Sequence, residues 1–204
     1  MVIKDYTNRH IFYKNNNFKM VSASIIDAEY IANNMRKSDI HECSIFNFTP
    51  YDAVTKPIIH YPNETYSIII NNKLVCLCGT APIPETNMGS IWGLGTDDID
   101  KYFVSWFKNT NKTIDIMQKN YEQVTNSIPL SNKKYIRWLK KSGFIFDKKT
   151  FFRKNEEMVQ FFRCNSFYNV IYNEESEPVI HWVTLGQSHW YVNQITQDNN
   201  CNLI

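Results

Sequence analysis

The sequence lacks the apolar run of about 18 residues that a membrane-spanning helix requires, and it lacks the pattern of a secretory signal peptide. We therefore expect no membrane-spanning segment and no export by a signal peptide. An excess of one charge is also missing, because the formal net charge is only +2 and the basic residues are scattered. This balance argues against a dedicated nucleic-acid binder, so we expect no nucleic-acid partner.

Cysteine and histidine are few and are not grouped. The 5 cysteines form neither a zinc spacing nor an even disulfide framework, and the 5 histidines fall on separate segments. We therefore expect no metal site. Cys76 and Cys78 alternate on one face of an expected strand, which predicts reduced thiols in the core.

Several common catalytic motifs are absent. The chain has no Gly-x-Ser-x-Gly elbow, no phosphate-binding Gly-Lys-Ser/Thr and no His-Glu-x-x-His. Glycine itself is scarce, with 6 in 204 residues, and no repeat or low-complexity tract occurs. The hydrophobic fraction of 43% and the aromatic fraction of 15% nevertheless indicate a globular chain.

The pattern of apolar residues and turn signals predicts alternating strands and helices after a polar arm at residues 1–19, which holds at most a short strand at 10–13. The expected elements are a strand at 20–23, helices at about 26–36 and from 38, a helix from 49 that Pro57 ends, a hairpin of 65–70 and 74–80, a strand at 90–95, a long helix to about 121, a strand at 123–128, a helix from 131 that Gly143 ends, and strands at 144–146, 150–153 and 159–164.

The stretch from Ser90 to Asp98 is the centre of this layout, because an apolar strand runs directly into a helix start. Thr96 followed by two aspartates suits the first turn of a helix. Two interpretations of Gly93 and Gly95 remain open at this point. In one, the two glycines allow a ligand to approach the backbone, and the N–H groups of the helix hold an anion. In the other, the glycines only relieve crowding.

A row of charged residues precedes this stretch. Arg36, Asp39 and Glu42 follow one another at steps of three, so a helix places them on one side. They form either a solvated row of ion pairs or the lining of a cleft.

Three segments carry a family resemblance. They are Ile91-Trp-Gly-Leu-Gly-Thr96, Asn132-Lys-Lys-Tyr-Ile-Arg-Trp-Leu-Lys-Lys-Ser-Gly-Phe144 and Arg36-Lys-Ser-Asp39-Ile-His-Glu42. Together with the element order, they resemble a bacteriophage family with the GCN5-related N-acetyltransferase (GNAT) fold, which includes the small internal virion protein of T7-like podoviruses. The resemblance covers residues 20–155, and we expect an N-terminal arm at 1–19, a GNAT-like domain at 20–160 and a C-terminal extension at 161–204.

The resemblance implies an α/β (α+β) fold of the acyl-CoA N-acyltransferase type, with a mixed, mainly antiparallel sheet flanked by helices. If the chain is an enzyme, the implied reaction is N-acetyl transfer from acetyl-CoA. The implied cofactor-binding residues are Gly93, Leu94, Gly95 and Thr96. Glu42 and Asp97 are the implied catalytic candidates.

Two departures from the enzymatic pattern favour a different role. Active members carry an Arg/Gln-x-x-Gly-x-Gly/Ala loop for the coenzyme A diphosphate, whereas here Gly95 passes directly to Thr96-Asp97-Asp98. Many also place an acid tyrosine where this chain has Leu139. We therefore expect a phage virion-associated or morphogenesis protein without a cofactor, found in the virion and the infected host cytoplasm, with acetyl-CoA-dependent N-acetyl transfer as the alternative.

The expected partners are other phage virion proteins, and an oligomer in the particle is allowed. The C-terminal extension reads as β-rich and carries amphipathic rings of the type enriched at interfaces, the candidate partner-binding residues being Tyr172, Trp182, Trp190 and Tyr191. It either docks to a partner or adds strands to the sheet.

Overall fold

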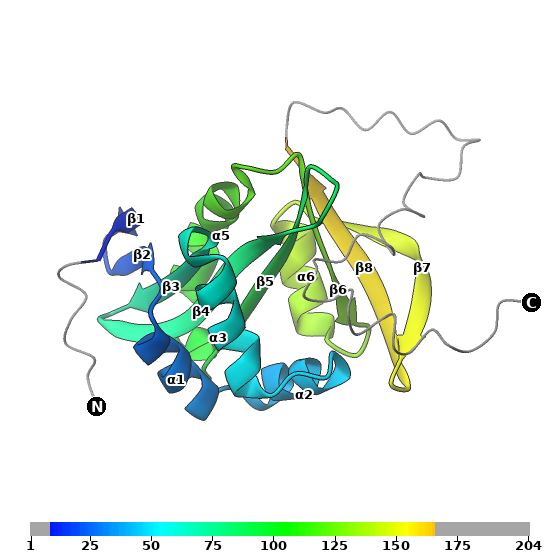
Figure 1. Cartoon of the computed structure of the whole chain (residues 1–204), viewed down its shortest axis with the longest axis horizontal. Coiled ribbons are helices and arrows are strands. Elements are labelled where there is room, and N and C mark those ends of the chain that lie inside the picture. Colours follow the sequence, from blue (N-terminus) through cyan, green and yellow to red (C-terminus); the bar gives the residue numbers. More distant parts are fainter. Residues whose placement is uncertain (1–8, 166–204) are drawn as a thin grey trace, which may run out of the picture.

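In the computed structural model, which describes residues 9–165, eight strands form a single sheet with helices on both faces (Figure 1). The strands are β1 (Ile11–Asn15), β2 (Phe18–Ser22), β3 (Thr65–Ile70), β4 (Lys73–Pro82), β5 (Met88–Gly95), β6 (Gln123–Pro129), β7 (Ile145–Arg153) and β8 (Glu156–Cys164). Their spatial order is β1-β2-β3-β4-β5-β6-β8-β7. Every neighbouring pair is antiparallel except β5 and β6, which are parallel. The mixed, mainly antiparallel sheet with an interior β5 is therefore confirmed.

The helices form two layers. They are α1 (Ile25–Asn33), α2 (Lys37–Ile45), α3 (Pro50–His60), the 3-10 turn η1 (Pro62–Glu64), α4 (Asp98–Lys101), α5 (Phe103–Gln118) and α6 (Lys133–Lys141). One core cluster joins α1, α2 and α3 to the sheet and contains Ile31, Ile69 and Leu77. A second cluster joins α5 and α6 to the sheet and contains Ile68 and Ile114. Apolar side chains thus fill both faces of the sheet, as expected for a three-layer arrangement.

Asparagine residues supply the tight turns of the first two hairpins. Asn71 and Asn72 have φ values of 52° and 59°, and they alone separate β3 from β4, as in a two-residue turn. Asn16 has a φ of 49° and lies between β1 and β2. The β1–β2 hairpin places the start of the sheet at Ile11, within the segment expected to be an arm with at most a short strand.

Local signals explain most helix boundaries. Ser24 caps α1 and forms a capping box with Asp27. The expected end of α3 at Pro57 is wrong, because the helix continues to His60. Proline cannot donate from its own nitrogen and crowds the carbonyl four residues earlier, but its carbonyl still accepts a hydrogen bond, here from Tyr61 N–H at 2.8 Å, which keeps the last turn.

The helix after β5 also differs from the expectation. It is divided at Tyr102 into the single turn α4 and the long helix α5, which ends at Gln118. Trp106 is buried as its periodicity predicts, whereas Phe103 and Phe107 are each 40% exposed. These two rings stack on each other with centroids 5.8 Å apart, so they cover part of each other's apolar surface.

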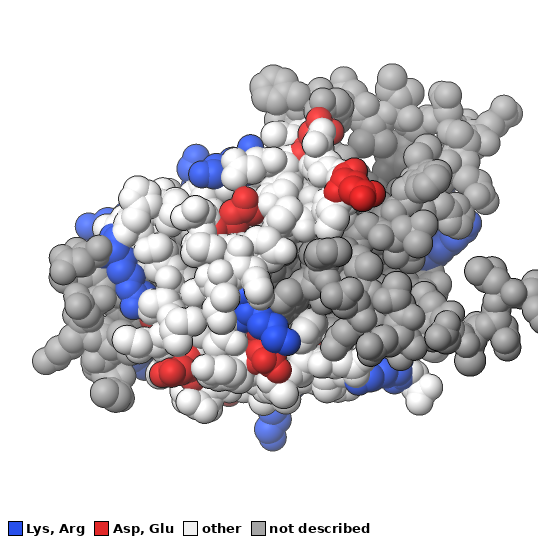
Figure 2. Space-filling model, in the orientation of Figure 1, with Lys and Arg blue, Asp and Glu red and all other residues white. Residues whose placement is uncertain are grey.

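The surface of the described residues shows neither a membrane-spanning helix nor a concentration of one charge on the face drawn in Figure 2. Within residues 9–165, no helix combines the length and the apolar character needed to cross a membrane. On the face drawn in Figure 2, acidic and basic side chains are interspersed among uncharged ones. The expected partner-binding residues Tyr172, Trp182, Trp190 and Tyr191 lie outside the described residues.

Candidate functional site

The parallel pair β5 and β6 is joined over only three residue pairs, from Met88–Gln123 to Ser90–Thr125. After Ser90 and Thr125, a hydrogen bond from the side chain of Asn126 replaces the backbone hydrogen bonds between the two strands. Its Nδ2 donates to the Ile91 carbonyl at 2.7 Å, and its Oδ1 accepts from Ser127 N–H at 2.7 Å. The two strands therefore separate after Ser90, and we call the space between 91–95 and 126–128 the β5–β6 gap.

The backbone of Gly93 faces this gap. Thr96 N–H donates to the Val75 carbonyl at 3.0 Å, and the register pairs Cys78 with Gly93. Since hydrogen-bonded and non-hydrogen-bonded pairs alternate in an antiparallel ladder, Gly93 belongs to a non-hydrogen-bonded pair and turns its N–H and C=O away from β4. The carbonyl of Ile91 has the same orientation. The open edge of β5 thus presents backbone donors and acceptors to the gap.

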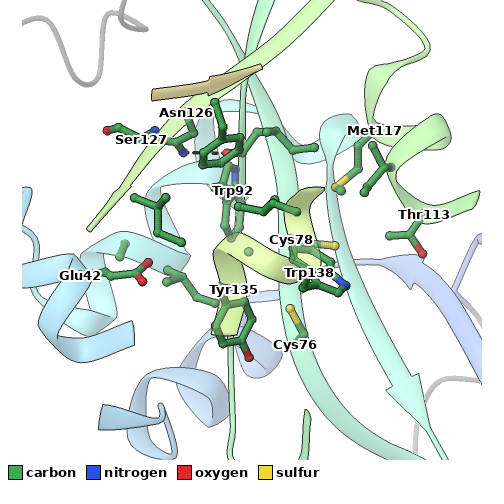
Figure 3. A pocket seen from close by; sticks show the side chains of 18 of the residues that line it. Glu42, Cys76, Cys78, Trp92, Thr113, Met117, Asn126, Ser127, Tyr135 and Trp138 are labelled. Carbon is green, nitrogen blue, oxygen red and sulfur yellow. Dashed lines mark hydrogen bonds between the residues drawn. The ribbon is translucent and has the colours of Figure 1, made fainter. Parts of the chain in front are cut away.

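A cavity of about 170 Å³ extends from the gap and is lined by side chains from α2, β4, β5, α5, β6 and α6. Figure 3 shows Glu42 on one side, Thr113 and Met117 on the other, and Tyr135 and Trp138 of α6 between them. Most of the lining is apolar or aromatic. Such a cavity with a few polar groups is typical of a small-molecule site.

Glu42 is a candidate catalytic residue with an unusual protonation equilibrium. It extends from α2 into the cavity lining, and Asn132 Nδ2 donates to its Oε1 at 2.7 Å. Burial, and to a smaller extent the negative charge of Asp39, raise the pKa of Glu42 from 4.5 to about 7, against the hydrogen bond from Asn132. A carboxyl that titrates near neutrality is well suited to accept a proton.

Arg36 and Asp39 are buried rather than solvated, being 8% and 2% exposed. Arg36 Nε donates to Asp39 Oδ1 at 2.6 Å, and Asp39 Oδ2 accepts the Gly95 N–H at 2.8 Å. Burial raises the pKa of Asp39 above its usual value, although Arg36 lies beside it. Arg36 and Glu42 line the cavity, so the cleft interpretation of this charged row describes the structure and the solvated one does not.

The expected cofactor-binding residues separate into two groups. Gly93 and Leu94 line the cavity, whereas Gly95 and Thr96 are buried beside it. A Cβ at Gly95 would lie 2.3 Å from Ile99 Cδ1, so this glycine is required for packing. A Cβ at Gly93 would meet nothing closer than 3.6 Å, so crowding does not explain that glycine.

The amides at the helix start after β5 do not favour the anion-binding interpretation of this turn. Gly95, Thr96 and Asp98 each donate their N–H within the chain, to Asp39 Oδ2, the Val75 carbonyl and Thr96 Oγ1 respectively. Asp97, the second catalytic candidate, is exposed and lies outside the cavity lining. Of the two candidates, the structure brings only Glu42 to the cavity.

Sequence reasoning missed two lining residues. Leu139, at the expected tyrosine position, is buried and lines the cavity, and Tyr135, one helical turn earlier on α6, lines it too. The spacing of four residues would have revealed this hydroxyl. Asn126 gave no signal, since an asparagine inside an expected strand says nothing about where a ladder ends.

Two cysteines of β4 contribute thiols to the cavity lining. Cys76 and Cys78 are buried on one face of β4, as expected. The pKa of Cys78 is well above its ordinary value because of the hydrogen bond with Cys76 and burial, so the thiol stays protonated. Within residues 9–165, no cluster of His, Cys, Asp and Glu has the arrangement of a metal site.

No protein-family model matches the sequence, and no curated protein matches it. Solved structures do resemble it. Spermidine N-acetyltransferase from Vibrio cholerae in complex with CoA and spermine is 14% identical, with a TM-score of 0.58 over 74% of this chain and 98% of that one. Ribosomal-protein-S5-alanine acetyltransferase from Vibrio fischeri is 18% identical, with a TM-score of 0.56 over 78% and 99%. At these identities the likeness establishes the fold, and the chain has the GNAT acetyltransferase fold.

Proposed function

We propose that this protein is an acyl-CoA-dependent N-acyltransferase that works at the β5–β6 gap, with Glu42 as the general base. One observation carries the proposal. A carboxyl with a pKa of about 7 lines an apolar cavity at the point where the two parallel strands separate. The neighbours named for acetyl transfer, one of them holding CoA, support this reaction class.

The gap fits one part of an acyl-CoA donor. The backbone edge at Gly93 offers an N–H and a C=O to a linear thioester arm, and no Cβ obstructs it. The diphosphate end does not fit in the usual way, because the amides of Gly95, Thr96 and Asp98 are already bonded. Lys73 lies 3.8 Å from Asp98 and partly neutralises the carboxylate there.

The residues of the chain perform the proton transfer and the positioning. The thioester supplies an activated acyl group when it is bound. Oε1 of Glu42 accepts from Asn132, which leaves Oε2 to receive the proton of the acceptor amine. Partial burial of this carboxyl, beside a lining that includes Trp92 and Trp138, keeps its pKa near neutrality. Tyr135 adds a hydroxyl to the same cavity.

Calorimetry with acetyl-CoA and an acetyl-transfer assay on a panel of amines test the proposal. We expect micromolar binding, and we expect Glu42→Gln to lower kcat by about 10²–10⁴-fold, the usual contribution of general base catalysis. Glu29→Gln is the matched control, since Glu29 is exposed on α1. Absence of heat up to millimolar acetyl-CoA, together with no transfer to any amine, would overturn the proposal.

A second candidate is a phage virion-associated or morphogenesis protein that uses this scaffold without the standard chemistry, in the virion and the infected host cytoplasm. The engaged amides of Gly95 and Thr96 support it, because they leave no backbone cradle for a diphosphate. Mass spectrometry of purified particles tests it. Trp182→Ala and Trp190→Ala should weaken incorporation by about 2 kcal/mol if they are interface hot spots. Absence from virions and assembly intermediates would refute the role.

A further inference from the structure

The charged groups of the cavity limit the kind of acceptor. Among the described residues that line it, only Arg36 and Glu42 are charged, one of each sign. A polyamine would bring several positive charges to one guanidinium and one carboxyl, so its charges would be unpaired in an apolar site. The cavity therefore does not complement a polycation such as the spermine held by one neighbour. It complements a molecule with one positive and one negative end.

Arg36 is a donor prepared for a ligand. Its side chain is more than nine-tenths buried, and Nη1 has no hydrogen-bond partner among the described residues. Leaving a buried N–H of a charged group unsatisfied is costly, which makes an oxygen from a bound ligand the natural partner.

The orientation of the guanidinium is fixed from two sides. Asp39 accepts from Nε at 2.6 Å, and the ring of Tyr135 lies 4.3 Å from Cζ. Asp39 is itself bound to the Gly95 N–H, so the pair is anchored to the end of β5. A donor held in this way loses little side-chain entropy when a carboxylate binds to it.

We propose that the acceptor is an amino acid with an apolar side chain, whose amine lies at Glu42 and whose carboxylate binds Arg36. The inference rests on the proposed function and names its substrate class. Arg36 lowers the pKa of Glu42 through its charge, which places the two groups within electrostatic reach of each other. The apolar side chain of the acceptor would lie among rings such as Phe46, Phe48 and Trp138.

The transfer balances with a thioester as the second reactant. The ammonium group of the amino acid gives one proton to Glu42, and the remaining amine forms an amide bond with the acyl carbon. The carbon–sulfur bond breaks, its electron pair leaves on sulfur, and the second proton of the nitrogen ends on that sulfur. The products are an N-acyl amino acid and a thiol.

Binding of the product class to the full chain tests the inference without turnover. We expect N-acetyl-L-phenylalanine to bind at least about tenfold more tightly than N-acetyl-L-phenylalaninamide in calorimetry, because only the first offers a carboxylate to Arg36. Arg36→Lys should remove most of that preference, since lysine lacks the planar fork. Arg137→Lys on the exposed side of α6 is the matched control and should keep it.

Equal affinity for the acid and the amide, or binding of neither, would overturn the inference. Acetyl transfer to spermidine or phenylalaninamide as fast as to phenylalanine would overturn it while the proposed function stands. Absence of acetyl transfer to every amine would instead count against the proposed function. If Arg36→Lys fails to fold, the affinities of the wild-type protein for N-acetyl-L-phenylalanine and N-acetyl-L-phenylalaninamide still test the inference.

Discussion

Replacing Glu42 by glutamine should make the protein more stable at neutral pH. In the folded chain the pKa of Glu42 is about 7, whereas the ordinary value is 4.5. The folded state therefore holds this proton more tightly than the unfolded state does. The stability that the protonated carboxyl contributes is fully present below pH 4.5 and is lost as the pH rises through about 7.

The size of the effect follows from the two pKa values. The interval from 4.5 to about 7 corresponds to about 3 kcal/mol at most. Glu42 is half-buried, so screening by solvent reduces this, and we expect about 2 kcal/mol. Glutamine does not titrate, yet its Oε1 can still accept the hydrogen bond from Asn132. The free energy of unfolding of the variant should therefore not fall with the titration of this residue, whereas that of the wild-type protein should.

Urea unfolding at pH 4.5 and pH 8 measures this difference. Wild type and Glu42→Gln should have nearly equal free energies of unfolding at pH 4.5, and the variant should be more stable by about 2 kcal/mol at pH 8. Subtracting one protein from the other cancels the titration of all other groups. Glu29→Gln is the matched control, because it makes the same change at an exposed position of α1. A difference between wild type and Glu42→Gln that is independent of pH would refute the reasoning.

Four further substitutions test the packing, each by urea unfolding. Gly95→Ala should cost at least about 1–3 kcal/mol, because its Cβ would overlap Ile99, whereas Gly93→Ala should leave stability within about 0.5 kcal/mol; equal losses would contradict the distinct roles of the two glycines. Asp27→Ala should cost about 3–5 kcal/mol, since Asp27 is fully buried and paired with Arg9, and a loss below 1 kcal/mol would contradict this. Leu139→Ala should cost about 2–5 kcal/mol, and an unchanged midpoint would show that its site is not packed.

The sequence predicts those parts of the fold that depend on near neighbours. Ser24 and Asp27 mark the start of α1, and Asn71-Asn72 marks the β3–β4 turn. Gly143 follows α6 with a φ of 85°, a conformation that favours glycine. In each case the deciding contacts lie within a few residues, so the pattern of residue types is sufficient.

The site depends on contacts between distant residues, and the sequence predicts only part of it. Glu42 lines the cavity, but its pKa depends on burial and on the distant Asn132, which no local pattern reveals. The gap itself depends on Asn126 meeting Ile91 across two strands. The sequence also suggests Asp97 as a base. Asp97 is exposed, however, because Thr96 and Ile99 take the inward positions of that turn.

The short parallel ladder has a mechanical consequence for the whole molecule. It joins five strands on one side to three on the other through three residue pairs, Met88–Gln123 to Ser90–Thr125. Each half is stiffened by longer antiparallel ladders, so bending is easiest along this seam. On the larger half, α2 is fixed to the end of β5, because Asp39 Oδ2 accepts the Gly95 N–H. The hydrogen bond from Asn132 to Glu42 therefore links helices that belong to different halves of the sheet, and the seam is reinforced at the cavity itself.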